Sequence, residues 1–162
     1  MALVRFLLIV LCAMGTASAQ LSGGVGFDTS KPSEIDAERV ERKDGGLTWV
    51  GEGAVRVSQP GVVLTADKMI ISLNPETNEI DEIEALGRVR YANVEGDAIA
   101  GDYAKFMATQ NNLTVTGHVV VLQGPQVATS DRLTYNTVTG AMVMSTEPGG
   151  RVRGLFAGEG SS

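Results

Sequence analysis

The stretch that decides the fold runs from Gly117 to Thr137 and reads GHVVVLQGPQVATSDRLTYNT. It contains a glycine, alternating valines, a Gly-Pro turn, a small residue followed by an aspartate, and a second alternating run. The same order occurs upstream in Gly53–Leu73, GAVRVSQPGVVLTADKMIISL, and in Gly87–Met107, GRVRYANVEGDAIAGDYAKFM. The opening glycines are 34 and 30 residues apart (87 − 53 and 117 − 87), which is a spacing typical of stacked repeats.

Apolar residues within these units follow a period of two, which predicts half-buried β-strands rather than helices. Turn-forming pairs such as Pro60-Gly61 and Gly124-Pro125 separate the strands. The second unit places its aspartate one residue later than the other two. A β-bulge between Tyr91 and Asp102 is expected to absorb this extra residue without turning the buried face outward.

One such unit cannot bury its apolar face alone, so the units are expected to stack. The predicted fold is all-β: an elongated, twisted antiparallel β-jelly roll, or open taco-like trough, built from about four units. Partial units at Ile35–Val40 and Gly150–Arg153 begin and end it. The predicted lining is Trp49, Val55, Val57, Leu64, Met69, Ile71, Ile83, Val89, Tyr91, Ile99, Phe106, Leu113, Val115, Val119, Val121, Leu133 and Tyr135. The pattern leaves open that this lining is an ordinary sealed core.

Residues 1–19 have the features of a secretory signal peptide: an early arginine, an apolar run and a small-residue exit, with cleavage expected after Ala19. An uncleaved membrane anchor is the alternative. We expect a flexible segment over residues 20–33, the β-domain over 34–156 and a flexible tail over 157–162. Without residues 1–19 the chain has no cysteine and carries 12 basic and 19 acidic residues, a net charge of −7. This acidic balance argues against a nucleic-acid partner.

Few residues suggest catalysis or metal binding. The single histidine, His118, follows a repeat glycine and is expected to face solvent. Asp67, Asp102 and Asp131 recur once per unit, so they should be spread along the molecule and satisfy local turn or strand-entry amides. The acidic run Glu76–Glu84 lacks the ligand spacing of an EF-hand. No enzyme activity, cofactor or metal site is predicted.

Several of these motifs, taken in order, resemble a known family. Ile35–Val40 (IDAERV), Trp49–Val55 (WVGEGAV), Leu64–Met69 (LTADKM) and Gly117–Val121 (GHVVV) resemble the OstA-like domain of the lipopolysaccharide-transport proteins, over roughly residues 34–156. The resemblance implies a twisted β-jelly roll. A short member with a removable signal peptide is similar to the family's periplasmic bridge component, which carries lipopolysaccharide from the inner to the outer membrane.

This resemblance also implies which residues bind. The lipid A acyl chains would contact the trough lining, represented by Trp49, Val55, Val57, Leu64, Met69, Ile71, Val89, Tyr91, Ile99, Phe106, Val119, Val121, Leu133 and Tyr135. An inner-membrane LptC-like protein would add to the N-terminal edge strand, and an outer-membrane LptD-like protein to the C-terminal one. Head-to-tail self-association would join the same two edges. The edge residues are Ile35, Ala37, Val40, Met142, Met144 and Val152.

Other classes of protein share parts of this pattern. Another OstA-like member, such as an LptC-type periplasmic domain, would have a similar sequence. A bactofilin-like structural β-solenoid would have a sealed core and shorter, more uniform rungs. A secreted carbohydrate-binding sandwich would need exposed aromatic residues, and only 5% of this chain is aromatic.

Overall fold

A computed structural model of the protein describes residues 31–155. The expected signal peptide, most of the expected N-terminal flexible segment and the expected C-terminal tail lie outside these residues. The strands are β1 (Glu34–Asp36), β2 (Arg39–Lys43), β3 (Thr48–Gln59), β4 (Val62–Leu73), β5 (Ile80–Asn93), β6 (Ala98–Met107), β7 (Asn112–Gln123), β8 (Gln126–Asn136), β9 (Met142–Ser145) and β10 (Arg153–Leu155). Two 3₁₀ turns, η1 (Asp44–Gly46) and η2 (Ala108–Gln110), precede β3 and β7.

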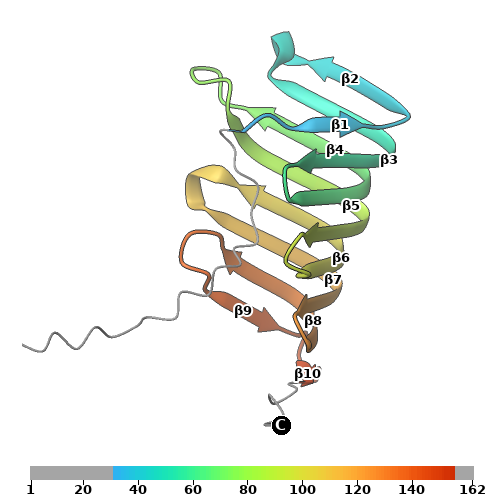
Figure 1. The fold of residues 1–162 in the computed structure, drawn as a ribbon, viewed down its shortest axis with the longest axis vertical. Helices are drawn as coiled ribbons and strands as arrows, with labels where there is room; N and C mark the ends of the chain where they lie inside the picture. Colours follow the sequence, from blue (N-terminus) through green and yellow to red (C-terminus); the bar gives the residue numbers. More distant parts are fainter. Residues whose placement is uncertain (1–30, 156–162) are drawn as a thin grey trace, which may run out of the picture.

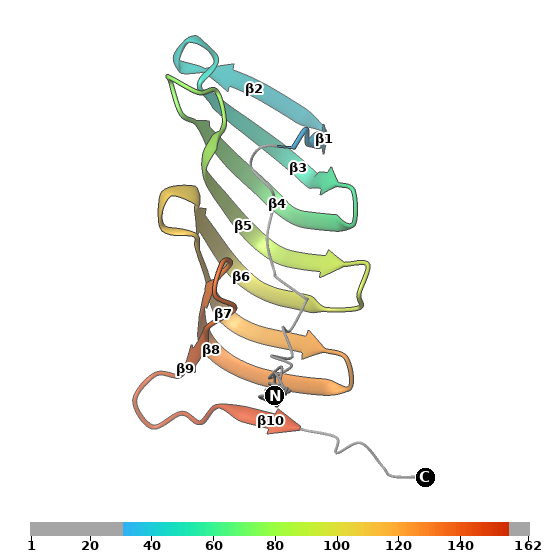
Figure 2. The same ribbon diagram turned by 60° about the vertical axis from the view of Figure 1, so that its left-hand side comes forward.

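All ten strands belong to one antiparallel sheet in which sequence neighbours pair, from β3 through β8. The strands stack along the long axis of the molecule, and the sheet curls about that axis (Figure 1). A view turned by 60° shows the strands crossing the stack as a series of curved rungs (Figure 2). The prediction of an elongated, open antiparallel trough is therefore confirmed.

The repeat glycines form the line along which this sheet bends. In β3, β5 and β7 the pairs Gly53–Ala54, Gly87–Arg88 and Gly117–His118 all have positive φ, and each interrupts the register. Two residues of the bulged strand then oppose one aspartate, which bends the strand and increases its twist. We call these three pairs the spine. The spine divides the sheet into a first arm, which includes β2 and β9, and a second arm, which includes β1 and β10.

The sequence predicts the extra residue of the second unit in a β-bulge within a strand, and the structure places it in a turn instead. Tyr91 pairs directly with Ile99, and the next inward pair, Val89 with Gly101, continues without a shift. The connection between β5 and β6 spans residues 94–97, whereas residues 60–61 and 124–125 suffice in the other two hairpins. Gly96 supplies a φ of 91° in this longer turn. The added residue therefore lies at the end of the hairpin, where it does not affect which face is buried.

Inward-facing residues form rows that cross the strands. The outer row of the first arm is Arg42, Trp49, Ile71, Ile83, Phe106, Leu113, Tyr135 and Met142. The row beside the spine is Val40, Gly51, Met69, Ala85, Ala104, Val115, Leu133 and Met144. The second arm contributes Ile35, Val57, Leu64, Tyr91, Ile99, Val121 and Ala128. These rows supply most of the buried hydrophobic core.

Candidate functional site, an apolar cleft between the arms

An apolar cleft lies between the two arms. Its cavity volume is about 40 Å³, and the space between its walls amounts to about 500 Å³ when the opening to solvent is included. Its lining is Leu64, Ile83, Ala85, Val89, Tyr91, Ile99, Ala104, Phe106, Leu113, Val115 and Thr137. None of these side chains is charged at neutral pH, and within the described residues no buried side-chain nitrogen or oxygen lacks a hydrogen-bond partner. Water or a polar solute would therefore find few groups to bind here.

Small side chains explain why the cleft is in the middle of the molecule. In the row beside the spine, Ala85 and Ala104 are neighbours on β5 and β6. Toward either end of the sheet the same row contains Met69 and Leu133, which are 1% and 0% exposed. These larger side chains fill the interior, whereas the two alanines leave space between the arms.

Every predicted lining residue of the trough faces the interior. Thirteen of the fourteen representative residues are buried, and Trp49 is half-buried against the core. Of the fourteen, the cleft is lined by Leu64, Val89, Tyr91, Ile99 and Phe106. The remaining buried residues, such as Val57 and Leu133 at 0% exposure, are closely packed core. The predicted role of these residues in lipid binding is taken up below as a proposal.

Sequence reasoning missed three residues of the cleft, namely Ala85, Ala104 and Thr137. The two alanines share the alternation parity of Ile83 and Phe106, so a signal for them was present. Alanine is small and only weakly hydrophobic, so its place in the alternation does not by itself identify a buried position. Thr137 lies beyond the end of β8, and its hydroxyl and backbone N–H both donate to the carbonyl oxygen of Asn111. The backbone part of this contact has a counterpart in the first unit, where the N–H of Leu73 donates to the carbonyl oxygen of Leu47 at 2.8 Å.

Each end of the sheet is formed by two short strands instead of one long one. At the N-terminal end β1 pairs with the second-arm half of β3 and β2 with its first-arm half. Ile35 and Val40 lie on these two strands, and Ala37 lies in the break between them. At the C-terminal end β9 and β10 divide β8 in the same way. Met142 and Met144 face inward on β9, whereas Val152 precedes β10 and is 45% exposed.

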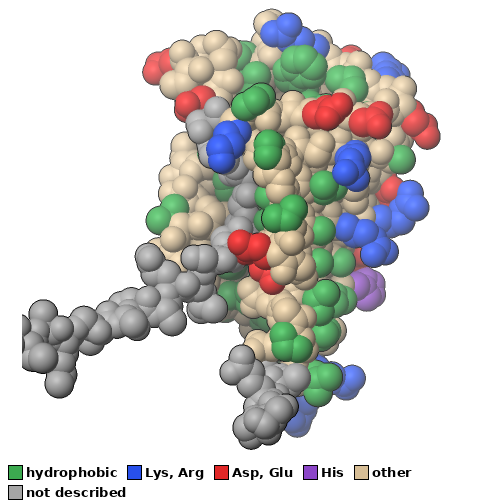
Figure 3. Space-filling view, viewed as in Figure 1, with side chains coloured by type: hydrophobic (Ala, Val, Ile, Leu, Met, Phe, Trp, Pro, Cys, Tyr) green, Lys and Arg blue, Asp and Glu red, His purple; other side chains and the backbone are tan. Residues whose placement is uncertain are grey.

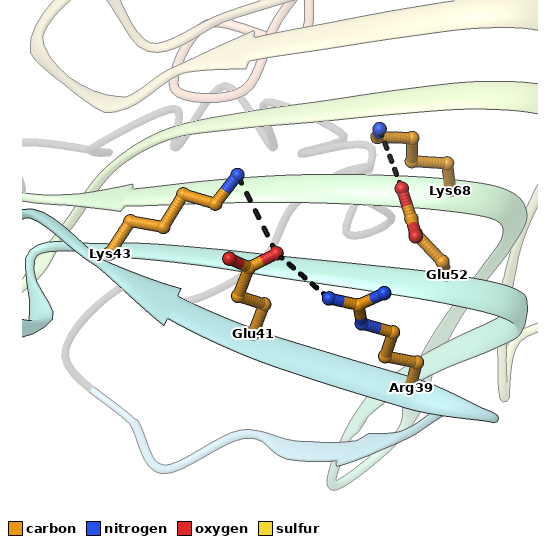
Figure 4. Close-up of polar contacts among 5 residues, drawn as sticks. All are labelled: Arg39, Glu41, Lys43, Glu52 and Lys68. Carbon is orange, nitrogen blue, oxygen red and sulfur yellow. Dashed lines mark hydrogen bonds and ion pairs between the residues drawn. The ribbon is translucent and has the colours of Figure 1, made fainter.

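The outer surface carries ion pairs between neighbouring strands. On the N-terminal strands Lys68 donates to Glu52 at 2.8 Å, and Glu41 lies between Arg39 and Lys43 (Figure 4). The hydrogen bond from Lys68 holds the pKa of Glu52 below its ordinary value. Charged side chains also gather along the upper right of the view in Figure 3, near these strands. Charged residues on and beside β2 are a common way to discourage unwanted pairing of an edge strand.

The recurring aspartates lie along the spine. Asp67 accepts a hydrogen bond from Arg88 Nε at 2.8 Å, and Asp102 lies 2.7 Å from Nδ1 of His118. The first contact lowers the pKa of Asp67, and the second raises the pKa of His118. The expectation of purely local amide bonding is therefore wrong for these two residues. Asp131 alone accepts from a backbone N–H, that of the distant Glu147, at 3.0 Å.

The prediction that His118 faces solvent is correct, since its side chain is 92% exposed. Among residues 31–155 no group of three or more His, Cys, Asp or Glu side chains is placed to hold a metal ion. No helix in that range is long and apolar enough to cross a membrane.

The fold and the sequence both resemble known lipopolysaccharide transport proteins. The fold matches the crystal structure of LptH from Pseudomonas aeruginosa, described as the LptA homologous periplasmic component of the conserved lipopolysaccharide transport device. The TM-score is 0.70 at 17% sequence identity, covering 81% of this chain and 99% of that one. No curated protein sequence matches. The family model of the LptA/(LptD N-terminal domain) LPS transport proteins matches residues 34–141, about two thirds of the chain. The chain therefore belongs to this family of lipopolysaccharide transport proteins.

Proposed function

We propose that this protein is a periplasmic lipid-binding bridge component that carries lipopolysaccharide from the inner to the outer membrane. The observation that carries the proposal is the uncharged cleft between the arms, in a chain that belongs to a lipopolysaccharide transport family. The role is one of binding and passage, and no step of it requires a chemical reaction.

The physical reason lies in the acyl chains of the lipid. Each methylene exposed to water costs about 0.8 kcal/mol, so an acyl chain needs cover throughout its passage. In the cleft, Ile83, Phe106 and Leu113 from the first arm face Leu64, Tyr91 and Ile99 from the second. An acyl chain between the arms would be covered on both sides, while its polar head group stays in solvent at the opening.

The split sheet ends would provide continuity with the neighbouring components. Both ends carry inward-facing apolar residues that are only partly covered, such as Ile35 at one end and Met142 at the other. A partner strand added at either end would extend the inner rows and prolong the apolar wall. The N-terminal end would take an inner-membrane LptC-like protein and the C-terminal end an outer-membrane LptD-like protein. Head-to-tail addition of a second copy uses the same two surfaces.

Photo-crosslinking in cells tests the proposal. A photoreactive phenylalanine analogue at Phe106 lies in the cleft, and the same analogue at Arg90 lies on the exposed outer face of the second arm. We expect lipopolysaccharide adducts at position 106 and none at position 90, because acyl chains are covered only between the arms. Folded, well-expressed protein without adducts at position 106, or with equal adducts at both, would contradict the proposal.

A further inference from the structure

One charged side chain interrupts the apolar inner rows. Arg42 on β2 pairs in register with Trp49, and Trp49 pairs with Ile71. Arg42 is therefore the first member of the outer row of the first arm, at the N-terminal end of the trough. Every other member of that row is apolar or aromatic. Alternation along β2 places its remaining charged residues, Arg39, Glu41 and Lys43, on the outer face.

The guanidinium of Arg42 is held in place by its surroundings. Its central carbon lies 5.2 Å from the centroid of the Trp49 ring, which is a cation–π contact. Its Nε donates to the carbonyl oxygen of Gly46 at 3.3 Å. Gly46 has a φ of 102°, and a Cβ atom at that position would overlap the guanidinium. A glycine, a ring and a backbone carbonyl together fix the direction of this side chain.

The charge of Arg42 has no carboxylate partner within the part of the chain that the structure describes. Its neighbours Arg39 and Lys43 share Glu41, at 3.4 and 3.6 Å. Among residues 31–155, Arg42 instead uses only Nε in a hydrogen bond, so the remaining donors of its planar fork have no partner there. A fixed guanidinium with free donors is well suited to a phosphate, which it can bind through two parallel hydrogen bonds.

The row also fixes the distance from this cation to the cleft. Adjacent strands are about 4.8 Å apart, so three strand steps separate Arg42 from Ile83 by about 14 Å, and four separate it from Phe106 by about 19 Å. Trp49, which is half-buried, and Ile71, which is 5% exposed, form the intervening wall. A hydrocarbon chain attached to a phosphate at Arg42 would therefore lie against Trp49 and reach the cleft by passing between Ile71 and the second arm.

We propose that Arg42, backed by Trp49 and Gly46, is an anion subsite at the N-terminal mouth of the trough. It binds a phosphate monoester on an amphiphile whose hydrocarbon chain lies along the inner row toward the cleft. This inference rests on the proposed function, and it adds a head-group contact at the end expected to receive the lipid. Arg42 then selects phosphorylated over neutral amphiphiles.

Equilibrium binding of two probes with the same twelve-carbon chain tests the subsite. Dodecyl phosphate carries the anion and dodecyl maltoside does not. For Arg42→Gln we expect dodecyl phosphate to bind about tenfold more weakly, as for loss of a charge-assisted hydrogen bond, and dodecyl maltoside to bind as in the wild type. Arg42→Lys should give an intermediate loss, because it keeps the charge without the fork. Circular dichroism and thermal unfolding check that each variant is folded.

The other outcomes overturn the subsite. Equal weakening of both probes would mean that Arg42 only supports the wall by covering Trp49, and unchanged binding of both would mean that it contacts neither. Inorganic phosphate that binds as tightly as dodecyl phosphate would make this a free-phosphate site. If the wild-type protein binds neither probe, the proposed lipid-binding function is contradicted. If the wild-type protein binds both probes and Arg42→Gln binds them with the same affinities, the lipid-binding function stands and only the anion subsite is contradicted. Should Arg42→Gln not fold, an unreduced affinity of Arg42→Lys for dodecyl phosphate overturns the planar-fork contact.

Discussion

At the scale of single residues, the recurring glycines and aspartates make the same contact twice: the aspartate of one strand packs against the glycine of the next strand. The carboxylate of Asp67 on β4 lies against Gly87 on β5, and that of Asp102 on β6 lies against Gly117 on β7. The glycine is needed for two reasons: φ is positive, and a Cβ atom would overlap the carboxylate. The aspartate in turn binds the residue after the glycine, Arg88 or His118.

Replacing Gly87 separates these two reasons. Gly87→Ala should lower the free energy of unfolding by about 2–3 kcal/mol, of which about 1–2 kcal/mol is left-handed backbone and the rest is displacement of Asp67. Gly96→Ala is the matched control, because Gly96 has a φ of 91° with nothing within 4 Å of the added atom. The control should show only the backbone cost. Urea unfolding of both variants measures the difference, and equal losses would show that the carboxylate contact contributes nothing.

At the scale of strands, the two ends of the sheet are built alike. β1 and β2 divide one end between the arms, and β9 and β10 divide the other. Short strands and outward charges limit indiscriminate pairing. On the inner side, however, β2 presents Val40, which is 44% exposed although it belongs to a buried row. An added partner strand would bury the exposed part of this side chain.

A charge at this position tests strand addition. Val40→Asp should weaken binding of the inner-membrane partner by tenfold or more, since it places a carboxylate in the apolar row that the partner strand would continue. Stability should change by less than about 1 kcal/mol, because the side chain is already half in solvent. Val120→Asp is the matched control at 39% exposure on the central strand β7. Binding measured by surface plasmon resonance that is unchanged in Val40→Asp, or equally weakened in the control, would argue against this edge.

At the scale of the whole molecule, the row beside the spine leaves space in its middle and is filled by larger side chains on either side of that space. Met69 and Leu133 close the packing on either side of the two alanines. A protein selected only for stability would fill that space, because unfilled apolar volume sacrifices dispersion contacts. The proposed function requires the space to remain.

Filling the cleft should therefore separate stability from function. Ala104→Leu adds three carbon atoms to the cleft, so the unfolding free energy should stay constant or rise by up to about 2 kcal/mol, while binding of dodecyl maltoside should fall sharply. Ala66→Leu is the control, since Ala66 is 4% exposed and lies outside the cleft lining. Overpacking there should cost about 1–3 kcal/mol. Thermal unfolding with probe titration measures both quantities, and full binding by a folded Ala104→Leu protein would show that ligand lies elsewhere.

Much of this architecture could be predicted from the sequence. Side chains alternate along a strand, so the spacing of Val55, Val89 and Val119 identified the buried face in every unit. The turn residues marked the hairpins, and the order of motifs indicated the family. The position of the extra residue near Asp97 was predicted wrongly, because an insertion in a strand and an insertion in a turn look the same when only spacings are known.

What the sequence by itself determined was which face of each strand is apolar, and hence a stack of β-hairpins with one apolar face. The tertiary structure alone decided which of those inward residues border unfilled space, and that Arg42 begins an otherwise apolar row. The physical reason is that alternation along one strand determines only which face of the sheet a side chain lies on. The side chains that it contacts on neighbouring strands depend on the register, and the register is set by the bulges at the spine together with the lengths of the turns.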